Sequence, residues 1–246
     1  MEIRRWMVLL LCSVSLGLCN AIESPQYTVV HTESDFEIRL YRDSTWMSAP
    51  VKDISFRKAT KLGFHRTHKM TVTISYFNGD YGHFNSRLSM TRTGAVKSSL
   101  FPSANLNFSR IAMTAPVLTS IVREAGPLHS SAYIVRFYLP VKFQASPPLP
   151  LSELNLRPRS WDSRCIAVRK FSGFARDNNI VEEAEKLGIS LNRSPWANST
   201  SSERSNAYSI AQYNSPFRII GRVNEVWVDI DASGLDGCKS SGLATY

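Results

Sequence analysis

Residues 35–41 read Asp-Phe-Glu-Ile-Arg-Leu-Tyr and alternate strictly between polar and apolar side chains. Phe36, Ile38 and Leu40 therefore share one face of an extended chain, which predicts a half-buried β-strand. Other stretches predict further strands along most of the chain, at Tyr27–His31, Trp46–Val51, Tyr133–Leu139, Arg164–Phe171, Asn206–Tyr213 and Glu225–Ile230. We therefore expect a fold that is built mainly from strands.

Two segments between these strands predict helices instead. Residues 55–66 begin with a Ser cap and carry polar residues at helical intervals. A second helix opens at Asp177 and is followed by apolar residues at helical spacing. Both helices contain Lys-Leu-Gly, at 61–63 and 186–188, with strands before and after each of them. This order predicts an α+β fold with an internal repeat, in which two main helices flank a barrel-like antiparallel sheet.

The amino terminus has the three parts of a secretory signal peptide. A basic start precedes the apolar run Trp6–Leu18, and small residues then predict cleavage after Ala21. The run is shorter than the roughly 20 residues of a membrane span, and no later segment approaches that length. We expect residues 1–21 to be removed and the rest to be secreted or kept in the endomembrane lumen, without a membrane span.

After such cleavage two cysteines remain, Cys165 and Cys238. An oxidising compartment allows one disulfide between them. Two unpaired thiols are the alternative, because Cys238 lies in the Gly/Ser-containing tail 233–246, which we expect to be flexible. No cysteine or histidine spacing typical of a metal site occurs.

The formal charge of +9 favours anionic ligands or acidic surfaces. Lys and Arg never form a run longer than two residues, and no nucleic-acid-binding signature is present, so we expect no nucleic-acid partner. The sequence has no Gly-x-Ser-x-Gly elbow, phosphate loop or Rossmann glycine fingerprint. These absences favour a binding protein over an enzyme.

Four short motifs carry a family resemblance. They are RIAMTAPV at 110–117, FYLPVKFQASPPLP at 137–150, FSGFA at 171–175 and GRVNEVW at 221–227. In this order they resemble the SOUL haem-binding proteins over roughly residues 24–66 and 100–232, most closely a secreted plant-type member. The resemblance implies one domain over residues 22–232, a distorted antiparallel β-barrel with two main helices in a pseudo-twofold arrangement.

The resemblance also implies a shallow apolar groove beside the first helix, which holds haem or another tetrapyrrole with basic side chains near the propionates. Lys61 and Phe64 lie three residues apart, hence on one helical face. Arg218 stands where the family carries a basic residue. The candidate binding residues are apolar, basic or imidazole side chains near this groove: Lys61, Phe64, His65, Met113, Phe217 and Arg218.

Two of these candidates have other interpretations. Met113 is either apolar lining, a soft iron ligand or ordinary core. His65 is the best axial candidate for the iron, although a surface or merely packed histidine fits the same pattern. In the last motif, Asn224 and Glu225 are expected to be a buried polar pair with a structural role. We expect no metal site of the protein's own.

One segment departs from the family pattern. Residues 67–99 follow the first helix and match none of the motifs, and they include His68. A long loop inside a small domain is unusual, so this atypical insertion is interpreted as a retained intron or a misassigned exon boundary. A genuine lineage-specific loop is the alternative.

The function that these observations predict is reversible, non-catalytic binding of haem or a related tetrapyrrole by a secreted monomer. Two other classes stay open. One is an enzyme that acts on a tetrapyrrole and uses His65. The other is an extracellular interaction protein whose groove binds an apolar peptide or lipid, which rests on fold analogy alone.

Overall fold

The structure, a computed structural model, describes residues 22–53, 55–69, 111–122, 132–197, 206–215, 217–231 and 238. These residues form one antiparallel sheet in the order β1-β2-β7-β9-β8-β4-β5-β3-β6. Its strands are β1 (Tyr27–Thr32), β2 (Glu37–Tyr41), β3 (Ser44–Lys52), β4 (Val117–Val122), β5 (Ala132–Tyr138), β6 (Arg157–Trp161), β7 (Arg164–Ser172), β8 (Asn206–Gln212) and β9 (Val223–Ile230).

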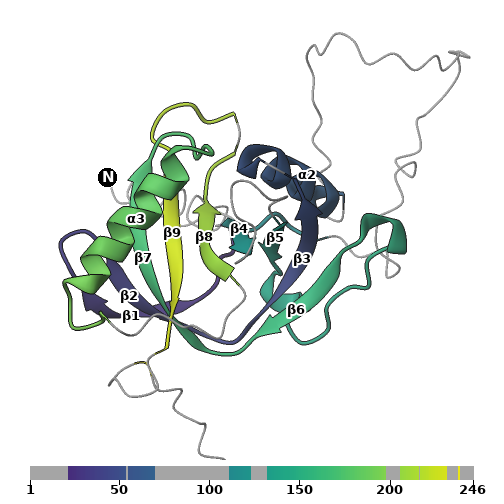
Figure 1. Ribbon diagram of the computed structural model, residues 1–246. Coiled ribbons are helices and arrows are strands. Elements are labelled where there is room, and N and C mark those ends of the chain that lie inside the picture. The colour runs from purple at the N-terminus through teal and green to yellow at the C-terminus, as the bar shows by residue number, and fades with distance from the viewer. Residues whose placement is uncertain are drawn as a thin grey trace, which may run out of the picture.

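Two helices, α2 (Phe56–His68) and α3 (Asn179–Asn192), cover the same side of the curled sheet (Figure 1). α2 packs mainly against β3 and β5, whereas α3 packs against β7 and β9. In the described residues the outer strands β1 and β6 each pair with a single neighbour, so the sheet is a half-barrel. Two short 3-10 helices, Val141–Phe143 and Ser152–Leu154, precede β6.

Both faces of the sheet are buried over much of their area, because alternate side chains of a strand point to opposite sides. Ile38 and Val135 belong to the core that the helices cover. Trp46 and Trp227 belong to a second, largely aromatic cluster on the opposite side. Burying one such apolar side chain contributes about 1.5–3 kcal/mol, so each face stabilises the sheet.

α2 begins where the sequence predicted, at the Ser55 cap. The Lys58 N–H donates to Ser55 Oγ over 3.4 Å, and Ser55 Oγ in turn donates to Asp177 Oδ2 over 3.0 Å, just before α3. Further along, Gly63 faces β5, and a Cβ atom at this position would lie 2.4 Å from the Cβ of Val135. Only glycine lets the helix approach the strand this closely.

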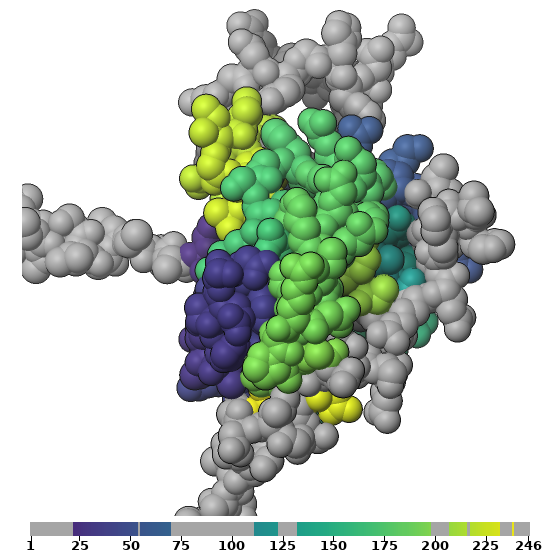
Figure 2. Space-filling model, turned by 60° about the vertical axis from the view of Figure 1, so that its left-hand side comes forward, coloured from purple at the N-terminus to yellow at the C-terminus, as the bar shows by residue number. Residues whose placement is uncertain are grey.

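α3 is attached to the turn between β1 and β2, and Figure 2 shows it lying beside these amino-terminal strands. Ser190 Oγ donates to Asp35 Oδ2 over 2.5 Å. Arg169 of β7 donates to the same carboxylate over 2.6 Å and to Glu183 of α3 over 3.1 Å. These contacts hold the helix, the turn and the sheet in one unit.

The predicted strands and both helices are present, which confirms the α+β class and the antiparallel sheet. Two strands escaped the sequence analysis, β4 and β6. Residues 157–161 read Arg-Pro-Arg-Ser-Trp, without the alternation of a strand. The proline is tolerated because β6 is an outer strand that pairs only with β3. α2 also continues to His68, two residues beyond its expected end.

A disulfide joins Cys165 of β7 to Cys238, with 5.7 Å between their Cα atoms. This pairing decides between the two alternatives that the sequence left open. Residues 1–21, 70–99 and 239–246 lie outside the described residues. The signal peptide, the atypical insertion and the flexible tail therefore stay predictions. Neither α2 nor α3 combines the length and apolar character that a membrane-spanning helix requires.

Candidate functional site

One flank of α2 brings together side chains that could bind a flat, anionic ligand. On a helix of about 3.6 residues per turn, Lys61, Phe64 and His68 lie on the same side, next to the face that packs on the sheet. The half-buried Phe64 ring has its centroid 5.6 Å from the ring of Phe137 and 5.5 Å from that of His68. Lys61 and His65 are exposed. The flank therefore combines an aromatic surface, imidazoles and a cation.

His68 is the residue of this flank that the sequence analysis missed. It was assigned to the insertion, although its spacing of four residues from Phe64 would have placed it on the same helical side. Burial lowers the pKa of His68, and the neighbouring charge of His65 lowers it further. The imidazole is thus neutral at pH 7, the form in which a ring nitrogen coordinates a metal.

Met113 is half-buried in the segment that precedes β4. Its neighbours Ile111 and Ala112 line a hollow of about 10 Å³ together with Thr67 of α2 and Phe137 of β5. That volume is at the lower limit for holding one water molecule. This hollow is therefore far too small to hold a tetrapyrrole.

The two remaining candidates, Phe217 and Arg218, lie on the loop between β8 and β9. Phe217 is 75% exposed, and Ile220, three residues further along the loop, is 86% exposed. Arg218 Nε donates to the carbonyl of Ile220 over 3.1 Å. Arg222 fastens the base of the loop, because its Nη1 donates to the carbonyls of Ser215 and Arg218 over 2.9 and 2.7 Å.

The structure thus places the six predicted residues in three groups. Lys61, Phe64 and His65 share α2, Met113 lies in the segment beside it, and the other two form an exposed loop. Within the described ranges, no hydrogen bond, ion pair or ring contact joins this loop to α2.

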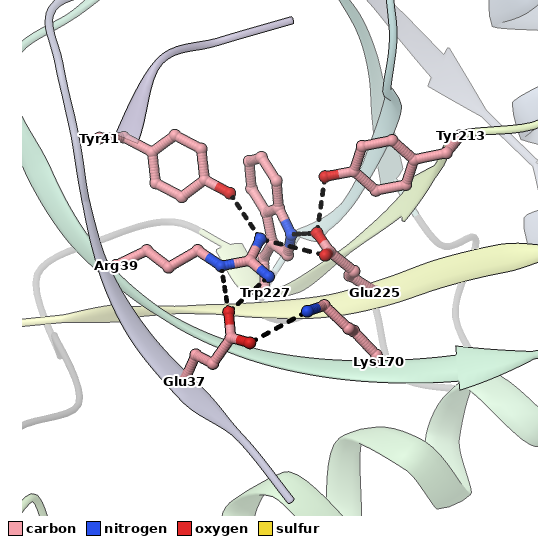
Figure 3. A network of polar contacts seen from close by, with 7 residues as sticks. All are labelled: Glu37, Arg39, Tyr41, Lys170, Tyr213, Glu225 and Trp227. Atoms are coloured by element: carbon pink, nitrogen blue, oxygen red, sulfur yellow. Dashed lines mark hydrogen bonds and ion pairs between the residues drawn. The ribbon is translucent and has the colours of Figure 1, made fainter. Parts of the chain in front are cut away.

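A separate network of buried charges lies on the opposite side of the sheet, centred on Arg39 of β2 and Glu225 of β9 (Figure 3). Arg39 Nη1 donates to Glu225 Oε1 over 3.0 Å, and Arg39 Nε donates to Glu37 over 2.8 Å. The other oxygen of Glu225 accepts from Tyr213 Oη and Trp227 Nε1, over 2.7 and 2.8 Å. The Glu225 carboxylate thus has three donors.

The charges of this network stabilise each other. Burial disfavours the charged form of Arg39, but the charge of Glu225 together with the contacts to Tyr41 and Glu37 outweighs it and raises the Arg39 pKa. Burial raises the pKa of Tyr213, and the charge of Glu225 raises it further. Because Glu225 is occupied by donors, it is not arranged as a general base. This agrees with the structural role predicted for it, as does the bond that Asn224 donates to the Gly173 carbonyl over 2.8 Å.

The described residues contain no group of three or more His, Cys, Asp and Glu side chains arranged to hold a metal ion. Haem differs from a free ion, because its porphyrin nitrogens bind the iron and the protein supplies at most the axial ligands. The donor set of the α2 flank fits such a group. It offers an aromatic face at Phe64, which the buried Phe137 supports, a neutral imidazole at His68 and an exposed ammonium at Lys61.

Comparison with known proteins identifies relatives over most of the chain. Residues 22–91 and 99–229 match the family described as SOUL heme-binding protein. Heme-binding protein 2 from Homo sapiens is 27% identical, over 85% of this chain and 86% of its own. Heme-binding protein 1 from Xenopus laevis is 26% identical, over 78% and 82%. A solved structure, that of a hydrolase from Listeria innocua, is 8% identical with a TM-score of 0.44, over 82% of this chain and 94% of its own.

Proposed function

Because the chain belongs to the SOUL heme-binding protein family, we propose that it binds haem or a related tetrapyrrole reversibly, without transforming it. The observation that carries this proposal is the family match over residues 22–91 and 99–229, which includes α2 and the strands of the sheet up to the penultimate residue of β9. The names of the curated relatives, heme-binding proteins 1 and 2, support the same ligand.

We place the binding surface on the exposed flank of α2. The half-buried ring of Phe64, which packs on the buried Phe137 at 5.6 Å, offers an apolar surface to a flat macrocycle. Lys61 offers an ammonium to a propionate, one helical turn away from Phe64. When bound, haem would supply two carboxylates and an iron that an imidazole can coordinate. Of the two imidazoles on this flank, His68, whose pKa is lowered by burial, would be the one to hold the iron.

The loop between β8 and β9 is proposed as the second wall of the site. Phe217, Ile219 and Ile220 are strongly exposed apolar side chains, and Arg218 adds a cation among them. Exposed apolar side chains that cluster in this way mark binding surfaces. Binding would cover these side chains and exclude water from one edge of the macrocycle.

A hemin titration tests the proposal. Purified protein is expected to shift the Soret band of hemin and to saturate at equimolar ratio. The double variant Lys61→Glu/Arg218→Glu should weaken binding by about tenfold, since it replaces the cations near the propionates. Arg176→Glu/Arg193→Glu makes the same change of charge at exposed positions beside α3 and should leave the affinity unchanged. Affinity no higher than that of an unrelated basic protein would contradict the proposal.

The axial ligand is tested separately. His68→Ala should move the Soret maximum and change the spin state of the bound iron, whereas His65→Ala should do neither. If both variants and the parent protein give equal spectra, His68 does not coordinate the iron, and the proposal of tetrapyrrole binding is unaffected.

We also propose that the protein acts in the secretory pathway or outside the cell. The predicted signal peptide supports this location, and so does the disulfide between Cys165 and Cys238, because such bonds persist in oxidising compartments. The plant-type assignment and the monomeric state stay predictions from the sequence. The internal repeat is supported by the order of the inner strands, because β7-β9-β8 corresponds to β3-β5-β4 taken from the opposite direction.

A further inference from the structure

A hollow of about 760 Å³ lies where β3, β5 and β6 meet. The strand register aligns its central side chains, because Arg136 of β5 is paired with Ser48 of β3 and Ser48 with Arg157 of β6. Side chains that are directly opposite in neighbouring strands share one face of a sheet. β6 stops pairing with β3 at Ser48, so Pro50 and the rest of β3 leave an open edge at the rim.

The hollow is lined by cations from four separate elements, and we call it the arginine hollow: Lys52, Arg66, Arg136, Arg157 and Arg159. The described residues that line it include neither Asp nor Glu. Trp161 and Ile134 add apolar wall. Its volume lies within the range of about 300–1,000 Å³ that small-molecule sites occupy.

Arg136 is the buried centre of the hollow, with 7% of its surface exposed. Its Nη1 donates to Ser120 Oγ, and its guanidinium carbon lies 5.3 Å from the ring centre of Trp161. Its Nε has no hydrogen-bond partner among the described residues, and neither has Ser48 Oγ, whose residue is 5% exposed. Both residues line the hollow, and each has a polar atom that is left without a partner in the described part of the fold.

The charge of Arg136 is uncompensated as well. No described carboxylate lies within ion-pairing distance of it, and Asp229, the acid that acts on it electrostatically, is paired with Arg164 at 3.8 Å. Burial lowers the pKa of Arg136; Asp229 opposes this, and the charges of Arg164 and Arg159 add to it. A guanidinium stays protonated at neutral pH even so. A buried charge of this kind is costly unless an anion accompanies it.

We propose that the arginine hollow binds a small organic polyanion, whose carboxylate or phosphate oxygens pair with Arg136 and accept from Ser48 while its body lies against Trp161. The exposed Arg157 and Arg159 guide the anion inward and neutralise its outer charges. Arg66 is held at the rim by the bond that its Nη1 donates to the Pro50 carbonyl over 3.0 Å. This site is distinct from the α2 flank, because Arg66 and Phe64 leave the helix in nearly opposite directions.

Calorimetric titration of the purified protein with two probes tests the proposal. Benzene-1,3,5-tricarboxylate represents a carboxylate source with a flat body, and inorganic pyrophosphate represents a phosphate source. We expect at least one probe to bind at equimolar ratio, and the tighter one identifies the chemistry of the natural anion. Arg136→Met should weaken binding by about tenfold or more. Arg157→Gln/Arg159→Gln, which changes only exposed side chains, should weaken it by a similar factor.

Arg176→Gln/Arg193→Gln is the matched control, because it removes two exposed arginines away from the hollow. If neither probe binds, or if this control loses as much affinity as Arg157→Gln/Arg159→Gln, the proposal is wrong. A parallel hemin titration separates the two sites. Protein that binds hemin but neither probe overturns only the anion site, and protein that binds a probe but not hemin overturns only the proposed function.

Discussion

Two arginines are buried on the same side of the sheet, but only one of them is paired with carboxylates. Arg39 of β2 is 1% exposed and donates to the carboxylates of Glu37 and Glu225. Arg136 of β5 is almost as deeply buried, yet its partner is the hydroxyl of Ser120. The pKa is raised at Arg39 and lowered at Arg136.

The comparison separates two uses of a buried cation. At the end of the sheet formed by β2, β7 and β9, the charges cancel inside the fold and bind strands together. At the end formed by β3, β5 and β6, one charge is left over and faces a hollow. A leftover buried charge does not help the fold, which is why we assign it to a ligand.

The largest effect is expected from breaking the network of buried charges around Arg39 and Glu225. Glu225→Gln removes the more deeply buried of the two carboxylates that pair with Arg39 and should lower the free energy of unfolding by about 3–5 kcal/mol, because it breaks a buried ion pair. Urea unfolding followed by far-UV circular dichroism measures it. Glu182→Gln, at an exposed position of α3, is the control and should change little. A loss below about 1 kcal/mol for Glu225→Gln would mean that the network does not stabilise the fold.

The second prediction compares how tightly the two helices pack at these two ends. Gly63→Ala places a Cβ against Val135 and should cost about 1–3 kcal/mol through overpacking. A Cβ at Gly188 of α3 meets no atom within 4 Å, so Gly188→Ala should stabilise by roughly 0.5–1 kcal/mol through helix propensity. Thermal unfolding of both variants checks this, and shifts in the same direction would contradict it.

The third prediction asks whether the fold needs Arg136 at all. Arg136→Met removes an uncompensated charge and should change the free energy of unfolding by less than about 1 kcal/mol in the absence of added anions. Arg39→Met, the matched change at the other end, should cost about 3–5 kcal/mol because the buried Glu225 carboxylate then loses its cation. If urea unfolding shows similar losses in the free energy of unfolding for the two variants, the two arginines do not differ in their contribution to stability.

The smallest expected effect is the loss, at acidic pH, of the stability that the Glu37 carboxylate contributes. Burial raises the pKa of Glu37, but hydrogen bonds from Lys170 and Arg39 outweigh it, so the folded pKa lies below 4.5. The stabilisation is therefore complete above pH 4.5 and is lost as the pH falls through the folded pKa. Because Glu37 is partly exposed, Glu37→Gln should lower the free energy of unfolding at pH 7 by only about 0.5 kcal/mol. Urea unfolding at pH 7 and pH 3 should show the difference from the parent protein shrinking; a constant difference would contradict it.

Local patterns in the sequence predicted most of the elements. The alternation around Ile38 placed β2 and its buried face, and the Ser55 cap placed the start of α2. β6 was missed because its residues have no alternation, and it becomes a strand only through its pairing with β3. At the candidate site, the helical spacing of Lys61 and Phe64 was readable, whereas the end of α2 at His68 was not.

The sequence by itself determined the α+β class, the family and the cationic character of the protein, because periodicity, motifs and charge are properties of neighbouring residues. Only the tertiary structure decided which charges meet. Arg39 and Glu225 are 186 residues apart, and Arg136, Ser48 and Arg157 share a row only through the register of three strands. The energy of a buried charge depends on the groups within a few ångströms of it, and in a sheet those groups come from distant parts of the chain.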